Sequence, residues 1–492
     1  MSTTSSPEKP YTASALETWA WGTGVITSAG IVMMFQQVMN IFTVAYGLSP
    51  VVLSWILLLP RIVDAFVDPV IGNWSDQTRS RWGRRKPFLL VSGCLGALLI
   101  GSIWWADPGW SHTVQFCFLG VLGVLIYICY GTYNMSYSAI GFELSDDYNE
   151  RSKIWAISGF FGAVNSLAVG WMYWFALRPM FGNEIWGMRW IGVGMALVMI
   201  GTTLITVYFT RERFTHSGTA KHVPILQALK ETTKNRPFVI LLIIKFLEFL
   251  GMRIATVIVV FYVCLYYVCP GNKDLATKIS GIAGTINVVG NFVFLPLVKP
   301  FSKFFGKRNA LVWGTLTMFL AALVTPFVLT PKHPYWVLIP TLIFTPMWVV
   351  NYTITNAILP DICDLDELEC GQRREGLYTA VYGFVSKVAI SLCLLLVGYV
   401  VVWAGVDTKQ LIQPPQVLHN LYWMAVIPGI FFTFLTLMAA LKFPMTEAVV
   451  KDIHRQLEAR RLARAAAGQP TDLVVEELVQ GHPEPGTPGP NS

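Results

Sequence analysis

Long stretches without a single charged residue are the feature that most constrains how this chain of 492 residues can fold. Only 13% of its residues are charged, about half the usual share in a soluble domain. About 20 apolar residues cross a bilayer, so a water-soluble globule and a disordered chain are both excluded. Eleven stretches lack Asp, Glu, Lys and Arg: 18–60, 87–106, 108–142, 154–177, 190–210, 254–272, 279–298, 309–331, 333–360, 388–406 and 410–441.

The first of these stretches is long enough for two crossings, because Gly47 and Pro50 interrupt it and its second part continues past Arg61. The pattern therefore predicts twelve transmembrane helices. Lipid-facing strands would instead alternate apolar and polar residues in segments of about ten. We expect an all-α membrane protein and no cleavable secretory signal, since the N-terminus is polar and the first apolar stretch is too long for one.

Two loop signatures recur at one interval, which predicts two six-helix pseudo-repeats. Gly83-Arg84-Arg85-Lys86 and Gly306-Lys307-Arg308 lie 223 residues apart, and the same interval separates Arg151 from Arg374. Such duplication is typical of transporters, whose substrate site lies near the membrane midplane between the repeats. The predicted segments are a cytoplasmic N-terminal tail (1–16), an N-terminal six-helix bundle (17–210), a cytoplasmic linker (211–236), a C-terminal six-helix bundle (237–443) and a cytoplasmic tail (444–492) that is disordered at its end.

Basic residues concentrate in alternate loops, which sets the expected orientation. The segments 79–86, 211–236 and 299–308 carry five, six and four Lys or Arg residues, whereas 107–112 carries none. By the positive-inside rule these basic loops and both termini are cytoplasmic, in a multi-pass protein of the cytoplasmic (inner) membrane. The net charge of +7 then reflects topology, not a nucleic-acid partner.

The eight cysteines do not suggest a disulfide framework. Most fall within predicted helices or a cytoplasmic loop, where thiols stay reduced and pack as small apolar groups. We expect no metal and no organic cofactor. The expected partners are a small solute and the lipid bilayer, and the expected state is a monomer.

The second predicted helix carries Arg61, Asp64 and Asp68 at membrane depth, where an ionisable residue by default marks a functional pathway. Spacings of three and four residues place all three on one helical face. Two carboxylates beside one guanidinium can hold one net cation, because Na⁺ or H⁺ relieves the repulsion between them. Asp64 and Asp68 are therefore the predicted cation site. A buried ion-pair network that only locks helices together is the alternative.

Two further helices carry charges in apolar surroundings. Lys245 and Glu248 are three residues apart and can neutralise each other. Lys387 has no charged neighbour on its own helix, so it must face a cavity or an acid on another helix. We expect Asp64 or Asp68 in the opposite half as its partner, an arrangement that would couple the cation to the substrate.

Amides, hydroxyls and aromatic rings recur along several predicted helices, which suits an uncharged polyhydroxylated ligand. Taken singly, each of these residues is also explained as a polar contact between packed helices. The predicted substrate residues are Ser28, Gln36, Tyr133, Tyr137, Tyr352, Asn356 and Lys387.

Charged residues of both signs cluster at the cytoplasmic ends of both halves. We expect them to pair across the halves when the cavity opens outward and to separate when it opens inward. With Arg61, which lies beside the cation site, the predicted gating residues are Asp76, Arg81, Arg84, Glu143, Arg151, Asp361, Asp364 and Arg374.

Three long blocks resemble the glycoside-pentoside-hexuronide:cation symporters, a branch of the major facilitator superfamily that includes the melibiose permease. They are the ordered pattern from Arg61-x-x-Asp64-Ala-x-x-Asp68-Pro to Gly83-Arg84-x-x-Pro87, the block 137–151, and the block 360–376. The resemblance implies a twelve-helix major facilitator fold and cation-coupled import of a sugar or glycoside by alternating access. It also implies a cation site at Asp64 and Asp68, with Lys387 in the central cavity.

This chain departs from the melibiose permease at both sites. Ser28, Tyr133 and Gly159 stand where the permease has two acids and an arginine, which does not fit a melibiose-like substrate. Val67 and Tyr130 stand where the permease has oxygen ligands for sodium. A proton needs only a carboxylate, so H⁺ is favoured over Na⁺ as the coupling ion.

Two other functions remain open. The same scaffold can carry a non-sugar solute or an amphiphile. A rival from another class is a membrane-embedded prenyl transferase, an enzyme in which Asp64/Asp68 and Asp361/Asp364/Asp366 chelate Mg²⁺-diphosphate. Arg61 beside the first acidic pair, basic residues beside the second, and the repeat of 223 residues argue against that enzyme.

Overall fold

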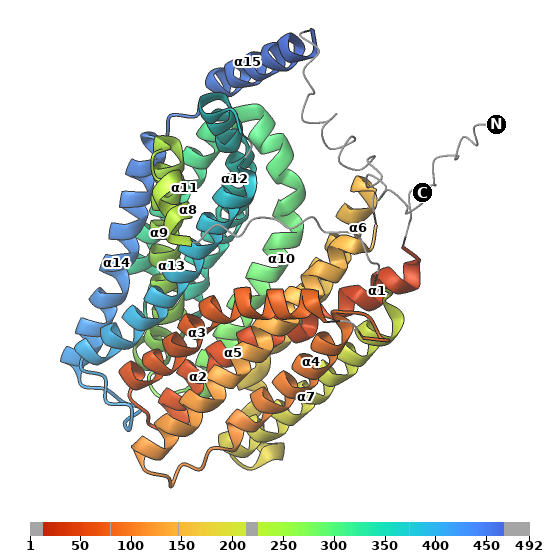
Figure 1. The fold of residues 1–492 in the computed structure, drawn as a ribbon. Coiled ribbons are helices and arrows are strands. Elements are labelled where there is room, and N and C mark those ends of the chain that lie inside the picture. The colour runs from red at the N-terminus through yellow and green to blue at the C-terminus, as the bar shows by residue number, and fades with distance from the viewer. Residues whose placement is uncertain (1–12, 79, 146, 213–224, 373, 467–492) are drawn as a thin grey trace.

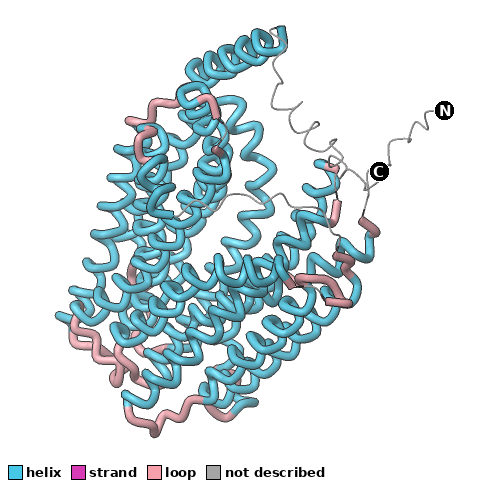
Figure 2. The backbone as a smooth tube through the Cα atoms, viewed as in Figure 1, coloured by secondary structure: helices cyan, strands magenta, loops and turns pink. Residues whose placement is uncertain are grey.

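The computed structural model describes residues 13–78, 80–145, 147–212, 225–372 and 374–466. Within these residues the chain is helical and forms no strand, and Figure 2 shows the helices joined by loops and turns. Side chains in the stretch 65–77 are described only at Ile71 and Trp74. The prediction of an all-helical fold is confirmed for the described residues.

The N-terminal bundle contains seven helices. Ser111, Asp147 and Asn183 begin three of them by accepting a hydrogen bond from the backbone N–H three residues later, which satisfies a donor left free at the helix start. Their bounds are α1 Ala15–Thr23, α2 Val25–Ala45, α3 Pro50–Gln77, α4 Lys86–Ser102, α5 His112–Glu143, α6 Tyr148–Ala176 and α7 Glu184–Phe209, with short 3₁₀ turns at Ile103–Trp105 and Pro179–Phe181.

The C-terminal bundle follows a short helix, α8, in the linker. Gly306 and Gly371 separate consecutive helices, and both have a positive φ (77° and 71°) that suits glycine. The bounds are α8 Ile225–Thr232, α9 Arg236–Val257, the π-helix η3 Ile258–Val268, α10 Lys273–Phe305, α11 Lys307–Val328, the 3₁₀ turn η4 Pro334–Val337, α12 Leu338–Cys370, α13 Glu375–Trp403, α14 Pro415–Leu441 and α15 Glu447–Ala466.

In the described part of the chain, ten helical segments are long and apolar enough to cross a membrane. The first of the ten combines α1 and α2, and neither α3 nor α9 is among them. Both of these helices are long enough, at 28 and 22 residues, and both carry intramembrane charges that the sequence analysis singled out. The structure is therefore that of a multi-pass, all-α membrane protein.

The two bundles contact each other along two helix pairs, α3 with α13 and α6 with α10. A glycine on the C-terminal bundle allows close approach in each pair. A Cβ on Gly398 would lie 2.5 Å from the Pro50 carbonyl oxygen and 2.7 Å from Ser54 Cβ, and one on Gly281 would lie 2.7 Å from the ring of Trp171. These positions hold glycine because a larger residue would force the bundles apart.

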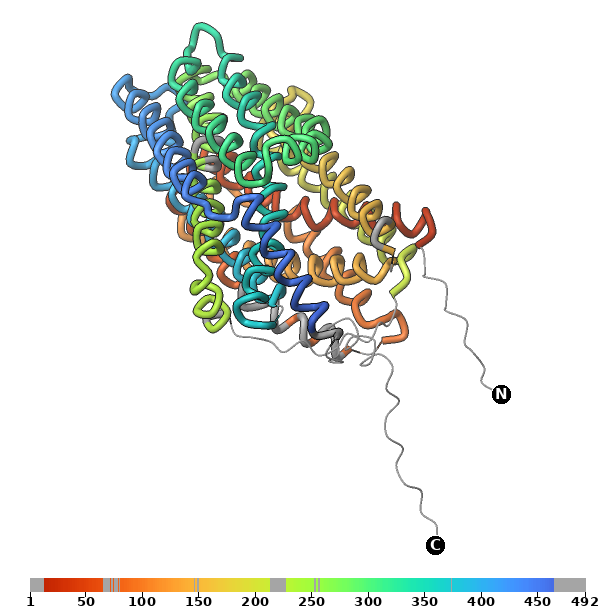
Figure 3. Tube along the Cα trace, turned by 90° about the horizontal axis from the view of Figure 1, so that it is seen from above, coloured from red at the N-terminus to blue at the C-terminus, as the bar shows by residue number. Residues whose placement is uncertain are grey.

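Within the described residues, the bundles are in contact along these helices and at one end of the molecule, while their other ends diverge. Polar contacts join them at the end that we call the loop end: Lys273 Nζ to Glu184 (2.8 Å), Thr408 Oγ1 to the Gly47 carbonyl (2.9 Å), and Arg178 to Asp274. In Figure 1 the bundles meet at the lower left, while their other ends point apart, with α15 at the top and α1 at the right. Figure 3 shows the red-to-yellow N-terminal helices beside the green-to-blue C-terminal helices. We call the diverging end the linker end.

Gly398→Ala should lower the free energy of unfolding by about 1–3 kcal/mol, because the added methyl group overpacks the contact between α3 and α13. Gly383→Ala on the same helix is the control, since nothing lies within 4 Å of a Cβ at that position. It should be neutral or slightly stabilising. Thermal unfolding of the purified protein in detergent measures both variants, and equal melting temperatures would contradict this account of the helix contact.

Candidate functional site

Asp64 of α3 and Lys387 of α13 form an ion pair that joins the two bundles. Lys387 Nζ donates a hydrogen bond of 3.0 Å to Asp64 Oδ2. The Asp64 side chain is buried, with 5% of it exposed, whereas 49% of the Lys387 side chain is exposed. The prediction that this lysine finds an acid in the opposite bundle is confirmed.

This pair is sensitive to the charge of its carboxylate. An ion pair needs both charges, so a proton or a metal cation on Asp64 would remove most of the attraction to the ammonium and weaken this contact. Arg61, one turn earlier on α3, places its guanidinium 5.7 Å from the centre of the Tyr127 ring. The side chains of Asp68, the second predicted cation ligand, and of Asp76 lie outside the described residues.

The predicted substrate residues of the N-terminal bundle are mostly buried in this conformation. Ser28 Oγ donates to Asn134 Oδ1 (2.9 Å), the Tyr133 hydroxyl donates to the Gly24 carbonyl (3.0 Å), and the Tyr137 hydroxyl lies 2.8 Å from Ser158 Oγ. All three side chains pack between helices, and Tyr133 is completely buried. Gln36 is half-buried. The structure does not bring the two tyrosines to an accessible surface.

The predicted substrate residues of the C-terminal bundle are accessible. Tyr352 is 48% exposed, and Asn356, one turn later on α12, is also exposed. Asn356 Nδ2 donates to the Tyr352 carbonyl over 2.9 Å. With Lys387 on α13, these two residues give the C-terminal bundle polar and aromatic groups that a ligand can reach.

The predicted gate of the N-terminal bundle is a compact ion-pair network at the linker end. Arg84 NH2 lies 3.1 Å from Glu143 Oε1, and Arg85 pairs with the same carboxylate. Glu212, which the sequence analysis did not single out, accepts from the backbone N–H groups of Arg85 (3.0 Å) and Lys86 (3.4 Å) at the start of α4. Gly83, which begins the Gly83-Arg84-Arg85-Lys86 signature, has a φ of 108°, a conformation that suits glycine.

The predicted acids of the C-terminal gate are held by bases of their own bundle. Lys307 Nζ contacts Asp361 Oδ2 at 2.6 Å. His454 Nε2 and Arg461 NH2, both on α15, lie 3.1 Å from Asp364 Oδ2 and 3.3 Å from Glu367 Oε1. The sequence analysis assigned no role to the two α15 residues, because the contact joins segments about 90 residues apart.

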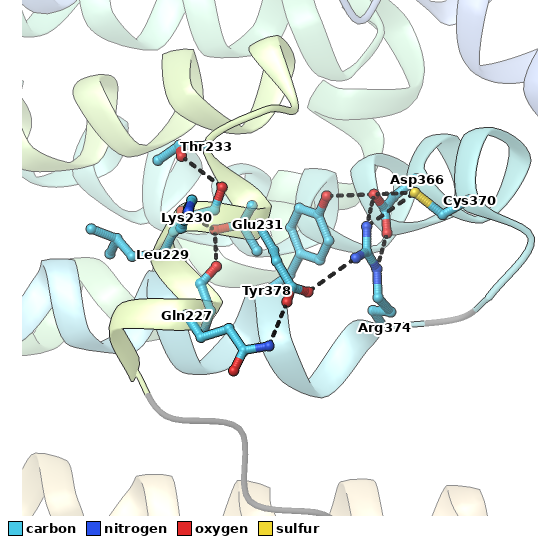
Figure 4. Close-up of polar contacts among 11 residues, drawn as sticks. Gln227, Leu229, Lys230, Glu231, Thr233, Asp366, Cys370, Arg374 and Tyr378 are labelled. Carbon is cyan, nitrogen blue, oxygen red and sulfur yellow. Dashed lines mark hydrogen bonds and ion pairs between the residues drawn. The ribbon is translucent and has the colours of Figure 1, made fainter.

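Arg374 is fixed between α12 and the linker helix α8, as Figure 4 shows. Its guanidinium binds both oxygens of Asp366 (2.9 and 2.7 Å) and also Glu231 Oε2 on α8 (3.2 Å). The Tyr378 hydroxyl donates to Asp366 over 2.8 Å. Hydrogen bonding to Asp366 raises the pKa of Arg374, so the guanidinium stays charged. The sequence analysis missed Asp366 and Glu231 as gate residues, although Asp366 lies within the acidic block it singled out.

Each gating side chain whose ion pair is described here finds its partner within its own bundle. Arg81 and Arg151 are exposed, and Arg151 Nε donates to the Ser145 carbonyl (2.6 Å). Separated gate groups are what we expect when the linker end is open. Their pairing across the bundles in the opposite state remains a prediction.

No group of three or more His, Cys, Asp or Glu side chains that could hold a metal ion occurs in the described ranges. Asp64 and Lys387 join the two bundles, and Tyr352 and Asn356 give the C-terminal bundle accessible aromatic and amide groups.

Comparison with known proteins identifies relatives over most of the chain. A family model described as MFS/sugar transport protein matches residues 20–447. An uncharacterised symporter, sll1374, from Synechocystis sp. (strain ATCC 27184 / PCC 6803 / Kazusa) is 26% identical, over 94% of this chain and 99% of its own length. The putative glycoside/cation symporter YagG of Escherichia coli (strain K12) is 24% identical over 87% and 91%. The isoprimeverose transporter of Lactiplantibacillus pentosus is 24% identical over 80% and 82%.

Solved structures support the fold. The nucleoside transporter NupG superposes with a TM-score of 0.59, at 12% identity, and covers 88% of this chain and 100% of its own. A D-xylose-proton symporter has a TM-score of 0.58 at 16% identity, over 87% of this chain and 97% of its own. At these identities the likeness concerns the arrangement of helices alone.

The contact of α15 with α12 gives a direct test of the site geometry. Replacing His454 and Arg461 together with alanine should accelerate hydrogen exchange in α15 by about 5–30-fold, since each exposed pair contributes up to about 1 kcal/mol. Arg455→Ala is the control, because its guanidinium pairs with Asp452 of the same helix (2.5 Å). Unchanged exchange in the double variant would show that these two ion pairs do not hold α15, and would leave apolar packing and the Arg460 hydrogen bond to the Leu368 carbonyl (2.6 Å).

Proposed function

Because the chain belongs to the MFS/sugar transport protein family, whose relatives here include glycoside–cation symporters, we propose that it imports a sugar or glycoside together with a cation by alternating access. The observation that carries this proposal is the ion pair between Asp64 and Lys387, which joins the bundles at a point where cation binding changes a charge. The chain is a transporter and not an enzyme, so the prenyl transferase alternative is excluded.

The proposal includes two helices beyond the ten apolar segments. Proteins of this fold are built from two similar halves; α3 stands as the second long helical segment of the first half, and the combined α9 and η3 stand as the first long segment of the second half. Most side chains in the second half of α3 lie outside the described residues, and α9 carries Lys245 and Glu248 within its apolar stretch. With them the chain has twelve transmembrane helices in two pseudo-repeats, and the basic loops place the linker end and both termini in the cytoplasm.

In the proposed cycle, the cation binds at Asp64 and Asp68 and neutralises one carboxylate. Lys387, released from Asp64, becomes free to donate to a substrate hydroxyl beside Tyr352 and Asn356. The contacts between the bundles at the loop end then break, and the gate charges at the linker end meet across the bundles. The described structure corresponds to the state that is open toward the cytoplasm.

We propose the proton as the coupling ion. Val67 and Tyr130 supply fewer oxygen ligands near the acidic pair than a hard cation prefers. A proton requires one carboxylate whose ionised form is disfavoured by a neighbouring acid. A non-sugar solute or an amphiphile on the same scaffold is the second candidate, because the buried Tyr133 and the exposed apolar residues of the C-terminal bundle do not demand a sugar.

Asp64→Asn should abolish accumulation of sugar against its gradient and spare exchange, because the variant keeps the cavity but cannot change charge with the cation. Uptake of radiolabelled isoprimeverose, lactose and D-xylose into proteoliposomes, with and without an imposed cation gradient, measures this. Asp452→Asn on α15 is the control and should behave as the wild type. Undiminished uphill uptake by Asp64→Asn would contradict the cation site.

The coupling ion is tested by the movement of protons. Adding the transported sugar to de-energised cells should make the medium more alkaline, and uptake should fall as the external pH rises above neutrality, since fewer Asp side chains are then protonated. Uptake that rises steeply with sodium at fixed pH, without proton movement, would overturn the proton assignment and leave sodium.

A further inference from the structure

A buried lysine, Lys245, lies against the ring of Tyr352, the aromatic residue among the proposed substrate groups of the C-terminal bundle. Lys245 and Glu248 sit on consecutive turns of α9, and each is 1% exposed. The Lys245 ammonium lies 4.4 Å from the centre of the Tyr352 ring, 5.0 Å from that of Phe249, 5.7 Å from that of Trp348 and 5.8 Å from that of Tyr382. The proposed cycle gives this pair no task.

The pair does not have the geometry of a closed ion pair. Lys245 Nζ lies 3.9 Å from Glu248 Oε2, whereas a charge-assisted N–H···O bond is about 2.7–2.9 Å long. The ammonium has no hydrogen-bond partner among the described residues, and the Asn351 side chain is the neighbour that interacts with the Glu248 carboxylate. The ammonium is thus displaced from its acid and held within cation–π distance of four rings, which is within about 6 Å.

Tyr352 is the most exposed of these four rings, and Trp348 is half-buried. Tyr352 is 48% exposed, whereas Phe249 and Tyr382 are 6% and 8% exposed. Tyr352 also stacks on Trp348, with ring centres 6.0 Å apart and planes inclined by 30°. A cation behind one ring face and a second ring beside it together restrict the orientation of Tyr352.

We propose that Lys245 is a positioning residue for the substrate: its buried ammonium holds the Tyr352 ring in the plane on which a sugar stacks, with Glu248 as the counter-charge. This inference rests on the proposed function, because it assigns Tyr352 to the substrate. A fixed ring needs no ordering when the substrate arrives, so its benefit is in affinity. The ammonium also draws electron density from the ring, which makes the Tyr352 hydroxyl a stronger donor to a sugar oxygen.

If the Lys245–Glu248 pair only stabilised the fold, removing both charges would have a different effect on transport. Replacing both members of a buried ion pair with apolar residues of similar size is often neutral or stabilising, whereas removing one member leaves an uncompensated charge. The double variant Lys245→Met/Glu248→Met is therefore expected to fold. If the pair only joins helices, this variant transports with wild-type kinetics.

The experiment compares KM and kcat in proteoliposomes for wild type, the double variant, Tyr352→Leu and the triple variant. The substrate is the member of the panel of isoprimeverose, lactose and D-xylose that gives saturable uptake. In the double variant we expect KM to rise about tenfold, equivalent to about 1.4 kcal/mol, with kcat little changed. Tyr352→Leu should raise KM similarly in wild type and add little to the double variant, because the two changes remove one interaction.

The outcomes separate this inference from the proposed function. Wild-type KM in a folded double variant, or fully additive effects of the Tyr352 change, would overturn the positioning role alone. Absence of saturable uptake of any sugar by the wild type would overturn the proposed function and this inference with it. Should the double variant fail to fold, Lys245→Leu/Glu248→Gln, which keeps a polar group at position 248, replaces it with the same readouts.

Discussion

The high cost of an ionised group in an apolar interior governs how this molecule is built. A charge at membrane depth persists only when it is paired, hydrated or held against polarisable groups. Asp64 forms an ion pair with Lys387, which lies on the other bundle. The stability of the charged acid therefore depends on how the two bundles are placed, and the placement of the bundles depends on the charge of the acid.

Other ion pairs lie at the two ends of the molecule. At the loop end, Lys273 with Glu184 and Arg178 with Asp274 cross from one bundle to the other. At the linker end, Arg84 with Glu143 and Arg374 with Asp366 stay within their bundles. At the linker end, where the bundles diverge, these side chains therefore form their ion pairs without any contact between the bundles. In the proposed cycle, the exchange of partners between these two sets accompanies the passage of substrate.

Sequence reasoning predicted the features that follow from the energetic cost of a single charge in an apolar helix. It missed the features that depend on contacts between segments far apart in the sequence. The lone Lys387 had to find an acid, so its contact with Asp64 could be inferred from hydropathy and spacing alone. Tyr133 and Tyr137 were assigned to the substrate, but a tyrosine can satisfy its hydroxyl inside a helix contact equally well, and both are buried. The capture of Asp364 and Glu367 by α15, and the π-helix η3, depend on packing between remote segments and left no pattern in the sequence.

The central claim is that a cation and a sugar together, and neither alone, close the linker end. Spin labels at Lys153 on α6 and Glu369 on α12, both exposed, report the distance between the bundles at that end once Cys117 and Cys370, the exposed cysteines of the described chain, are replaced by serine. Pulsed electron paramagnetic resonance gives the distance distribution. The account predicts a shift to shorter distances only when the transported sugar is added in acidic medium. A shift of equal size with sugar in alkaline, sodium-free medium, or no shift under any condition, would contradict it.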